Sequence, residues 1–284
     1  MNTPNESASA QVETPNRMEQ PPGYGPPPAG PPAPAAVLDP NNPPWGMIAG
    51  ILTWFGSVLL LFVMSFLFLV PYLFVYKGKT EELLTDKTAI FLQILSTIPA
   101  HLLTLVIVWA VVTHFGKRPF WRTLGLTWSE RVGVWTSIGL AVGLLAIGLV
   151  ISQLIGGNKP TAIDQIINSS AASRYTLALI AALTAPLVEE LVYRGVLYSA
   201  LQKTLNMFWA IIGVSILFTL VHLLQYYNNP GVIIAISVLS LSLTLVRAFT
   251  GRLLPCVVIH FIFNGLQSLW IILYPYFEHT GTGG

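Results

Sequence analysis

Two carboxylates and one guanidinium lie together inside a long apolar stretch of this sequence. Glu189, Glu190 and Arg194 fall near the middle of the apolar run Tyr175–Leu201. A charge at the centre of a bilayer costs at least about 2.5–3.5 kcal/mol, so such charges indicate a functional site. Glu190 and Arg194 are four residues apart, share one helical face and can form a buried ion pair. Glu189 is turned by about 100° and has no cation of its own, which suits a general base.

A proline precedes these charges. Pro186 is expected to kink the helix and to free a backbone carbonyl beside the site. A second interpretation stays open at this point, because the three charges could also form a purely structural network that holds helices together.

Two histidines lie in other apolar runs, each with a partner one helical turn away. His222 follows Phe218 by four residues, and His260 precedes Asn264 by four. Polar groups in apolar helices need partners, and Glu189, His222 and His260 lie at similar depths in their runs. A carboxylate, two imidazoles and an amide are the parts of a hydrolytic site. We expect them to line one cavity between the fourth, fifth and seventh helices.

The composition indicates the elements that must hold these groups. The chain of 284 residues is 54% hydrophobic and only 9% charged, against about 25% charged in a soluble domain. This excludes an ordinary soluble enzyme, a disordered protein and, with a net charge of +2, a nucleic-acid binder. Because a spanning helix needs about 20 apolar residues, the sequence predicts an all-α, multispanning transmembrane bundle of about seven or eight helices. The apolar runs are Met47–Tyr76, Ile90–His114, Val134–Ile155, Tyr175–Leu201, Met207–Tyr227, Val232–Phe249 and Leu253–Phe277. The first of these runs is long enough to tilt in the membrane or to break at Pro71.

The N-terminal part differs from the rest. Residues 1–44 hold 13 of the 21 prolines, a composition that predicts a disordered Pro-rich tail without a signal peptide. Residues 45–278 form the predicted transmembrane domain, with a protease-like core at about 175–267. The lone Cys256 is expected to be a small core residue.

Charged residues between the runs indicate the orientation. The second, fourth and sixth loops carry seven lysines and arginines and the other three loops carry five, which favours a cytoplasmic N-terminus. The basic and aromatic segment 117–122 is expected to lie at the membrane interface.

Three spaced motifs carry a family resemblance. The pattern Glu-Glu-x-x-x-Arg, then Phe-x-x-x-His, then His-x-x-x-Asn on successive membrane helices resembles the type II CAAX prenyl protease family, also called CPBP or Abi. The motif residues are Glu189, Glu190, Arg194, Phe218, His222, His260 and Asn264. The resemblance covers roughly residues 175–267.

The resemblance implies an intramembrane endopeptidase. It implies that Glu189 and His222 activate water, that His260 and Asn264 stabilise the oxyanion, and that Glu190 and Arg194 support them. The family is often called a metalloprotease, and Glu189, His222 and His260 could ligate a catalytic zinc with water in the fourth position. We favour a metal-free site, because the sequence has no His-Glu-x-x-His helix and an amide such as Asn264 is a poor zinc ligand.

Other functions remain to be compared with proteolysis. A proton-coupled transporter would show broken helices in two related halves, and the sequence has one charged helix. A non-catalytic scaffold or bacteriocin-immunity protein could keep the motifs for folding. The expected partners are a peptide or membrane-protein substrate and the lipid bilayer. The short loops suggest a multi-pass protein of a bacterial inner membrane, for which a bacteriocin leader, a small membrane peptide or a membrane-bound regulator is a more plausible substrate than a prenylated protein.

Overall fold

The computed structural model describes residues 39–157 and 160–280, with side chains up to residue 277. All regular elements in these residues are helices. Seven helical spans are long and apolar enough to cross a membrane, so the prediction of an all-α, multispanning bundle is confirmed. Most of the predicted Pro-rich tail, residues 1–38, lies outside the described residues.

Most spans are single helices, and two are composite. The single-helix spans are α1 (Met47–Leu73), α5 (Val134–Ile155), α10 (Met207–Tyr226), α11 (Pro230–Thr250) and α12 (Leu254–Thr280). The second span consists of α2 (Lys87–Leu95) and α3 (Thr97–Thr113). The fourth consists of α7 (Ala171–Leu179), η2 (Ile180–Thr184), α8 (Ala185–Glu190), η3 (Leu191–Leu197) and α9 (Tyr198–Leu205). Short helices between the spans are η1 (Thr80–Thr85), α4 (Phe120–Leu124) and α6 (Ala162–Ser169).

Local residues explain where several helices begin and end. Asp86, Asn206 and Asn229 each accept a hydrogen bond from the first turn of the following helix, which satisfies a backbone amide that has no helical partner. Pro71 lies inside α1, which ends two residues later at Leu73, so the first run does not divide there into two helices.

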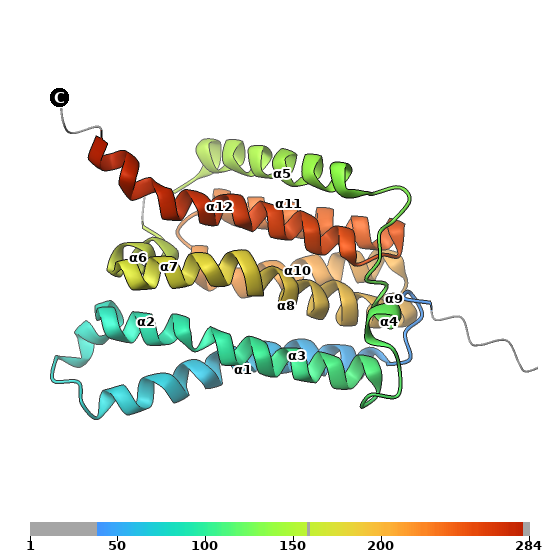
Figure 1. The fold of residues 1–284 in the computed structure, drawn as a ribbon, viewed down its shortest axis with the longest axis horizontal. Helices are drawn as coiled ribbons and strands as arrows, with labels where there is room; N and C mark the ends of the chain where they lie inside the picture. The colour runs from blue at the N-terminus through green and yellow to red at the C-terminus, as the bar shows by residue number, and fades with distance from the viewer. Residues whose placement is uncertain (1–38, 158–159, 281–284) are drawn as a thin grey trace, which may run out of the picture. The chain divides into compact units, whose positions relative to one another are not determined.

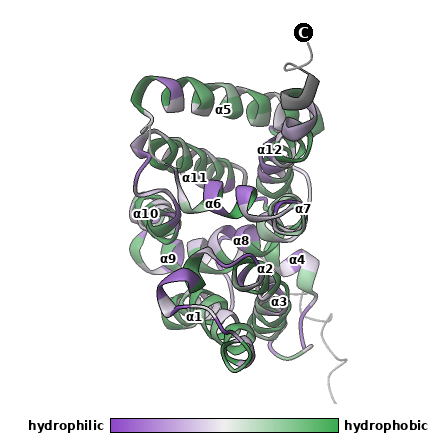
Figure 2. Ribbon diagram, turned by 90° about the vertical axis from the view of Figure 1, so that its left-hand side faces the viewer, coloured by the Kyte–Doolittle hydropathy of each residue, from purple (hydrophilic) through white to green (hydrophobic). Residues whose placement is uncertain are grey.

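The fourth span lies at the centre of the bundle. Seen end on, α8 is surrounded by the other helices, with α1 and α3 towards one edge and α5 at the other (Figure 2). The outer helix α5 packs on α11 and α12, while α1 packs on α3 and η3 (Figure 1). All seven residues of η3 are buried. The charged fourth run is therefore the most enclosed of the spans, and the other spanning helices lie around it.

The end of the bundle where α1 begins is tied together by polar contacts. The Arg247 guanidinium is fully buried and donates to the Asn41 side chain at 2.6 Å and to the Pro40 carbonyl at 2.8 Å. Lys203 Nζ donates to the Pro43 carbonyl at 2.8 Å. The last residues of the predicted tail thus contact the helical bundle, and the second, fourth and sixth loops gather at this end.

The packing of α1 on the fourth span depends on Gly50. A Cβ atom at Gly50 would lie 2.8 Å from Cβ of Ala200, whereas one at Gly56, also in α1, would have no neighbour within 4 Å. We predict that Gly50→Val lowers the free energy of unfolding by about 1–3 kcal/mol through overpacking. Thermal unfolding in detergent measures this, with Gly56→Val as the control for β-branching. Equal melting temperatures of the two variants would contradict the close helix contact.

Candidate active site

The helix that carries Glu189 and Glu190 changes from α-helical to π-helical hydrogen bonding on both sides of these residues. The preceding η2 is a π-helix, in which each amide bonds the carbonyl five residues earlier, as Ala185 does with Ile180. The next amide in that register would bond Ala181, but Pro186 has no N–H group. The Ala181 carbonyl instead accepts a hydrogen bond from Asn264 Nδ2 at 3.2 Å. This confirms the carbonyl that Pro186 was expected to free.

The predicted ion pair forms in the interior of the bundle. Arg194 Nη1 lies 2.8 Å from Glu190 Oε1, and neither side chain is exposed. Arg194 Nη2 donates to the hydroxyl of Ser240 at 2.8 Å and to its carbonyl at 3.0 Å. Arg194 Nε donates to Thr244 Oγ1 at 3.3 Å. Two residues of α11 therefore share this guanidinium with Glu190, which offsets the cost of burying the charge.

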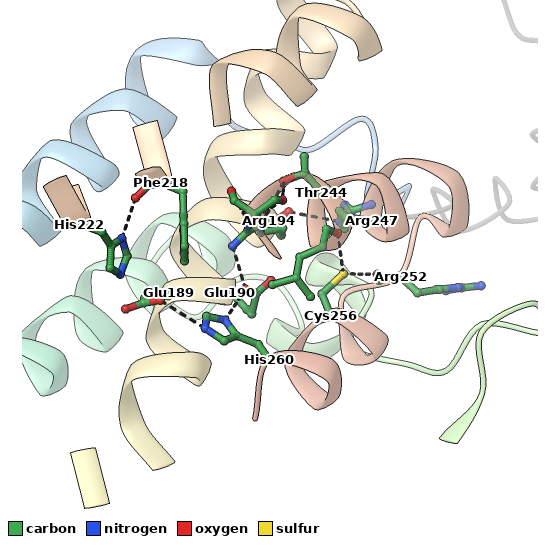
Figure 3. A network of polar contacts seen from close by, with 12 residues as sticks. Glu189, Glu190, Arg194, Phe218, His222, Thr244, Arg247, Arg252, Cys256 and His260 are labelled. Atoms are coloured by element: carbon green, nitrogen blue, oxygen red, sulfur yellow. Dashed lines mark hydrogen bonds and ion pairs between the residues drawn. The ribbon is translucent and has the colours of Figure 1, made fainter. Parts of the chain in front are cut away.

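His260 joins this pair to Glu189. Its Nδ1 lies 2.8 Å from Glu190 Oε1, and its Nε2 lies 3.7 Å from Glu189 Oε2 (Figure 3). A carboxylate only accepts hydrogen bonds, so Nδ1 must be the donor to Glu190. His260 is almost completely buried, whereas 25% of the Glu189 side chain is exposed. Glu189 is thus the accessible carboxylate of the two, and the imidazole of His260 lies next to it.

The second motif places a further imidazole beside this group. His222 Nδ1 lies 2.8 Å from the carbonyl of Phe218 in the same helix. The carbonyl accepts, so Nδ1 carries the proton, and in the neutral ring Nε2 keeps its lone pair. Figure 3 shows the Glu189 carboxylate between the imidazoles of His222 and His260 in this view. His222 is therefore prepared to accept a proton at Nε2.

Phe218 explains why the second motif begins with an aromatic residue. Its ring, which is 1% exposed, contacts the rings of His222 and His260 at centroid distances of 4.8 and 6.0 Å. The Arg194 guanidinium lies 4.6 Å from the same ring, close enough for a cation–π interaction. The Phe218 ring therefore packs against the guanidinium and both imidazoles.

All predicted site residues occur on elements that meet around α8. Direct contacts link Glu189, Glu190, Arg194, Phe218, His222 and His260. Asn264 lies one turn beyond His260 in α12 and is tied to η2. The catalytic roles of these residues and the shared cavity stay predictions.

Sequence reasoning missed several residues that support the site. Ser240 and Thr244 looked like ordinary helix residues, although their spacing of four in α11 places them on one face. Arg247, which lies near the end of α11, is fully buried and donates from Nε to the carbonyl of Arg194 at 3.2 Å. His101 of α3 has its Nδ1 2.9 Å from Thr184 Oγ1 at the start of α8. The sequence signal that could have identified His101 is its position as a polar residue inside an apolar run.

The three residues considered as zinc ligands do not form a ligand cluster. Within residues 39–157 and 160–280, no group of three or more His, Cys, Asp or Glu side chains is placed to hold a metal ion. His222 and His260 each direct Nδ1 to a fixed acceptor. Ligating histidines commonly donate the other ring N–H to a carbonyl or carboxylate, so these Nδ1 contacts leave Nε2 of each ring to face a ligand, and the metal-free site stays a prediction.

The contacts of the two adjacent glutamates indicate that they contribute differently to the free energy of unfolding. Removing Glu190 leaves Arg194 buried without its carboxylate, which costs about 3–5 kcal/mol, whereas Glu189 is partly exposed and has one longer contact. We predict a large loss of thermal stability in detergent for Glu190→Ala and a small one for the neighbouring control, Glu189→Ala. A loss for Glu189→Ala that equals or exceeds that for Glu190→Ala would refute these roles.

Comparison with known families agrees with the motifs. Residues 171–266 match the family described as "Type II CAAX prenyl endopeptidase Rce1-like". This segment begins with α7 and contains all three motifs. No curated protein and no solved structure shows a significant match to the chain. The predicted resemblance is confirmed for this segment: residues 171–266 are similar to the type II CAAX prenyl endopeptidase family, also called CPBP.

Proposed function

We propose that this protein is an intramembrane endopeptidase that hydrolyses a peptide bond with water activated by Glu189 and His222. The observation that carries the proposal is the arrangement around His260, which contacts a buried, ion-paired carboxylate on one side and the accessible carboxylate of Glu189 on the other. The family match over residues 171–266 supports the reaction class.

Glu189 is the proposed general base. It takes a proton from a water molecule, and the resulting hydroxide adds to the carbonyl carbon of the substrate peptide. Nε2 of His222 has the lone pair needed to accept a hydrogen bond from the same water. General acid–base catalysis of this kind contributes about 10²–10⁴-fold to a rate.

His260 and Asn264 are the proposed oxyanion donors. With Nδ1–H bound to Glu190, His260 can donate from Nε2 only when the ring is protonated. That form balances the charges of the site, because Glu190 then pairs with Arg194 and Glu189 pairs with His260. One N–H of the Asn264 amide bonds the Ala181 carbonyl, and the second serves the substrate oxygen. Each well-placed donor is worth about 2.7–4 kcal/mol.

The reaction ends with cleavage of the tetrahedral intermediate. The carbon–nitrogen bond breaks and the proton taken from water passes to the leaving amine. The new carboxylic acid then gives its proton to that amine, so a carboxylate and an ammonium group are released. Glu189 and His222 are the groups that hold the proton taken from water in between. The remaining network, Glu190 with Arg194, keeps the orientation of His260 fixed through these steps.

The proposed substrate is a peptide or a membrane protein that enters from the bilayer. Glu189 belongs to a span at the centre of the bundle and retains an exposed surface, which supports this proposal. We place the basic end of the bundle, where α1 begins, on the cytoplasmic side of a bacterial inner membrane, by the excess of lysine and arginine in its loops. A bacteriocin leader, a small membrane peptide or a membrane-bound regulator fits this setting.

The proposal predicts that the cell contains peptides whose cleavage depends on Glu189. Membrane peptides from cells that express the wild type are compared by mass spectrometry with those from cells that express Glu189→Ala. Substrates should accumulate with the variant and be cleaved by the wild type purified in detergent. Identical peptide profiles and no cleavage would favour the non-catalytic scaffold instead.

For a substrate identified in this way, Asn264→Ala should lower turnover about 10²–10³-fold by removing one oxyanion donor. Asn264 is half-buried, so the fold should remain, and circular dichroism checks this. Gln267→Ala, a change one turn further along α12, is the matched control and should keep turnover. Equal turnover of wild type and Asn264→Ala would remove Asn264 from the mechanism.

Removal of metal tests the mechanism independently. If the described side chains work as base, acid and oxyanion donors, protein stripped with a strong chelator should keep its turnover. The measurement is cleavage of the identified substrate before and after stripping, together with the zinc content per chain. One zinc per chain, with loss of activity on stripping and recovery on adding zinc, would overturn the metal-free mechanism.

A further inference from the structure

A cavity outside the active site lies between the beginning of α1 and the end of α3. Its volume is about 280 Å³. Apolar side chains line most of it, including Trp45 and Ala49 at the start of α1 and Ala110 and Val111 near the end of α3. His114 and Arg118 contribute its polar lining. The cavity therefore combines an apolar wall with cationic and hydrogen-bonding groups at one end of two spanning helices.

One wall of this cavity is fixed by a buried hydrogen bond, and the other is formed by a turn. Trp45 is 6% exposed, and its indole Nε1 donates to the Val196 carbonyl at 3.0 Å. On the other side, His114 and Phe115 both have positive φ angles, of 50° and 57°. Such angles cost energy in L-residues and are concentrated at functional sites. The turn formed by His114 and Phe115 ends α3 and brings the chain to Arg118.

The charge of the cavity is unbalanced. No hydrogen bond or ion pair of the Arg118 guanidinium occurs among the residues that the structure describes. Lys117, Arg122 and Arg131 lie in the same loop, where Glu130 is the single acidic residue between residues 115 and 133. The exposed Trp121 of α4 in this loop is a side chain typical of the membrane interface. An anionic group is the natural partner for this loop.

We propose that this cavity binds one anionic phospholipid. The phosphate lies against Arg118 and His114, and the upper part of an acyl chain lies along Ala49, Ala110 and Val111. A soluble anion would use the cations and leave the apolar wall unused, whereas a phospholipid matches both parts. Basic pockets between spanning helices bind anionic headgroups in this way. The proposal does not depend on the proposed protease activity.

Native mass spectrometry of the full chain in detergent tests the proposal. The protein is incubated with phosphatidylglycerol or with phosphatidylcholine of the same acyl chains, and the lipid-bound fraction is measured. The wild type should retain phosphatidylglycerol in preference to phosphatidylcholine. Arg118→Gln should retain about fivefold less phosphatidylglycerol, the effect of one base near an anionic headgroup. Arg131→Gln, an exposed arginine of the same loop, is the matched control and should behave like the wild type.

A second variant separates the cavity from general surface attraction. Ala110→Phe fills the apolar part without changing any charge and should also reduce retention, while thermal unfolding verifies that it folds. Equal phosphatidylglycerol retention by the wild type and Arg118→Gln would overturn the proposal. So would equal retention by the wild type and Ala110→Phe, because the lipid would then be bound outside the cavity. Equal retention of the two lipids would show unspecific binding and overturn it as well.

Discussion

The structure is organised by the need to satisfy one guanidinium in the interior of the bundle. Arg194 is fully buried within a membrane-spanning segment and receives partners from its own helix and from α11. Removing a partner leaves a buried charge uncompensated, at a cost of about 3–5 kcal/mol. The arrangement of Glu190 follows from this need, and Glu190 in turn fixes His260 of α12. The orientation of the proposed catalytic imidazole thus depends on an ion pair that takes no part in the chemistry.

Arg247 is a second buried guanidinium that needs partners, and it finds them in the N-terminal segment. Its guanidinium is also fully buried, and it connects Pro40 and Asn41 with the backbone of Arg194. The residues just before α1 are therefore two contacts away from the ion pair of the site. The proposed lipid cavity lies at this end, and one wall of it, Trp45, is bonded to η3. The N-terminal segment, the proposed lipid cavity and the candidate active site thus all contact one central span.

The sequence predicted what depends on local geometry. The spacing of four between Glu190 and Arg194 defines a shared helical face whatever the tertiary structure, and the pairing is confirmed. The contacts of Arg194 with Ser240 and Thr244 depend on how α11 is rotated against the fourth span, which no local pattern encodes. The division of the second span near Ser96 and the π-helical segments around α8 also escaped prediction, because hydropathy records apolar length and not hydrogen-bond register. Pro186 alone predicts that a carbonyl is freed, but the identity of that carbonyl as Ala181 follows from the π-helical register, which was not predicted.

A structure with a bound transition-state analogue tests the central claim most directly. A peptide phosphonate carries two oxygens in place of the attacking water and the oxyanion. If the account is correct, one oxygen lies about 2.7–3.1 Å from His260 Nε2 and from Asn264 Nδ2, and the other lies within hydrogen-bonding distance of Glu189. The Glu190–Arg194 pair stays unchanged. A phosphonate held elsewhere, or oriented with neither oxygen near His260, would contradict the proposed site.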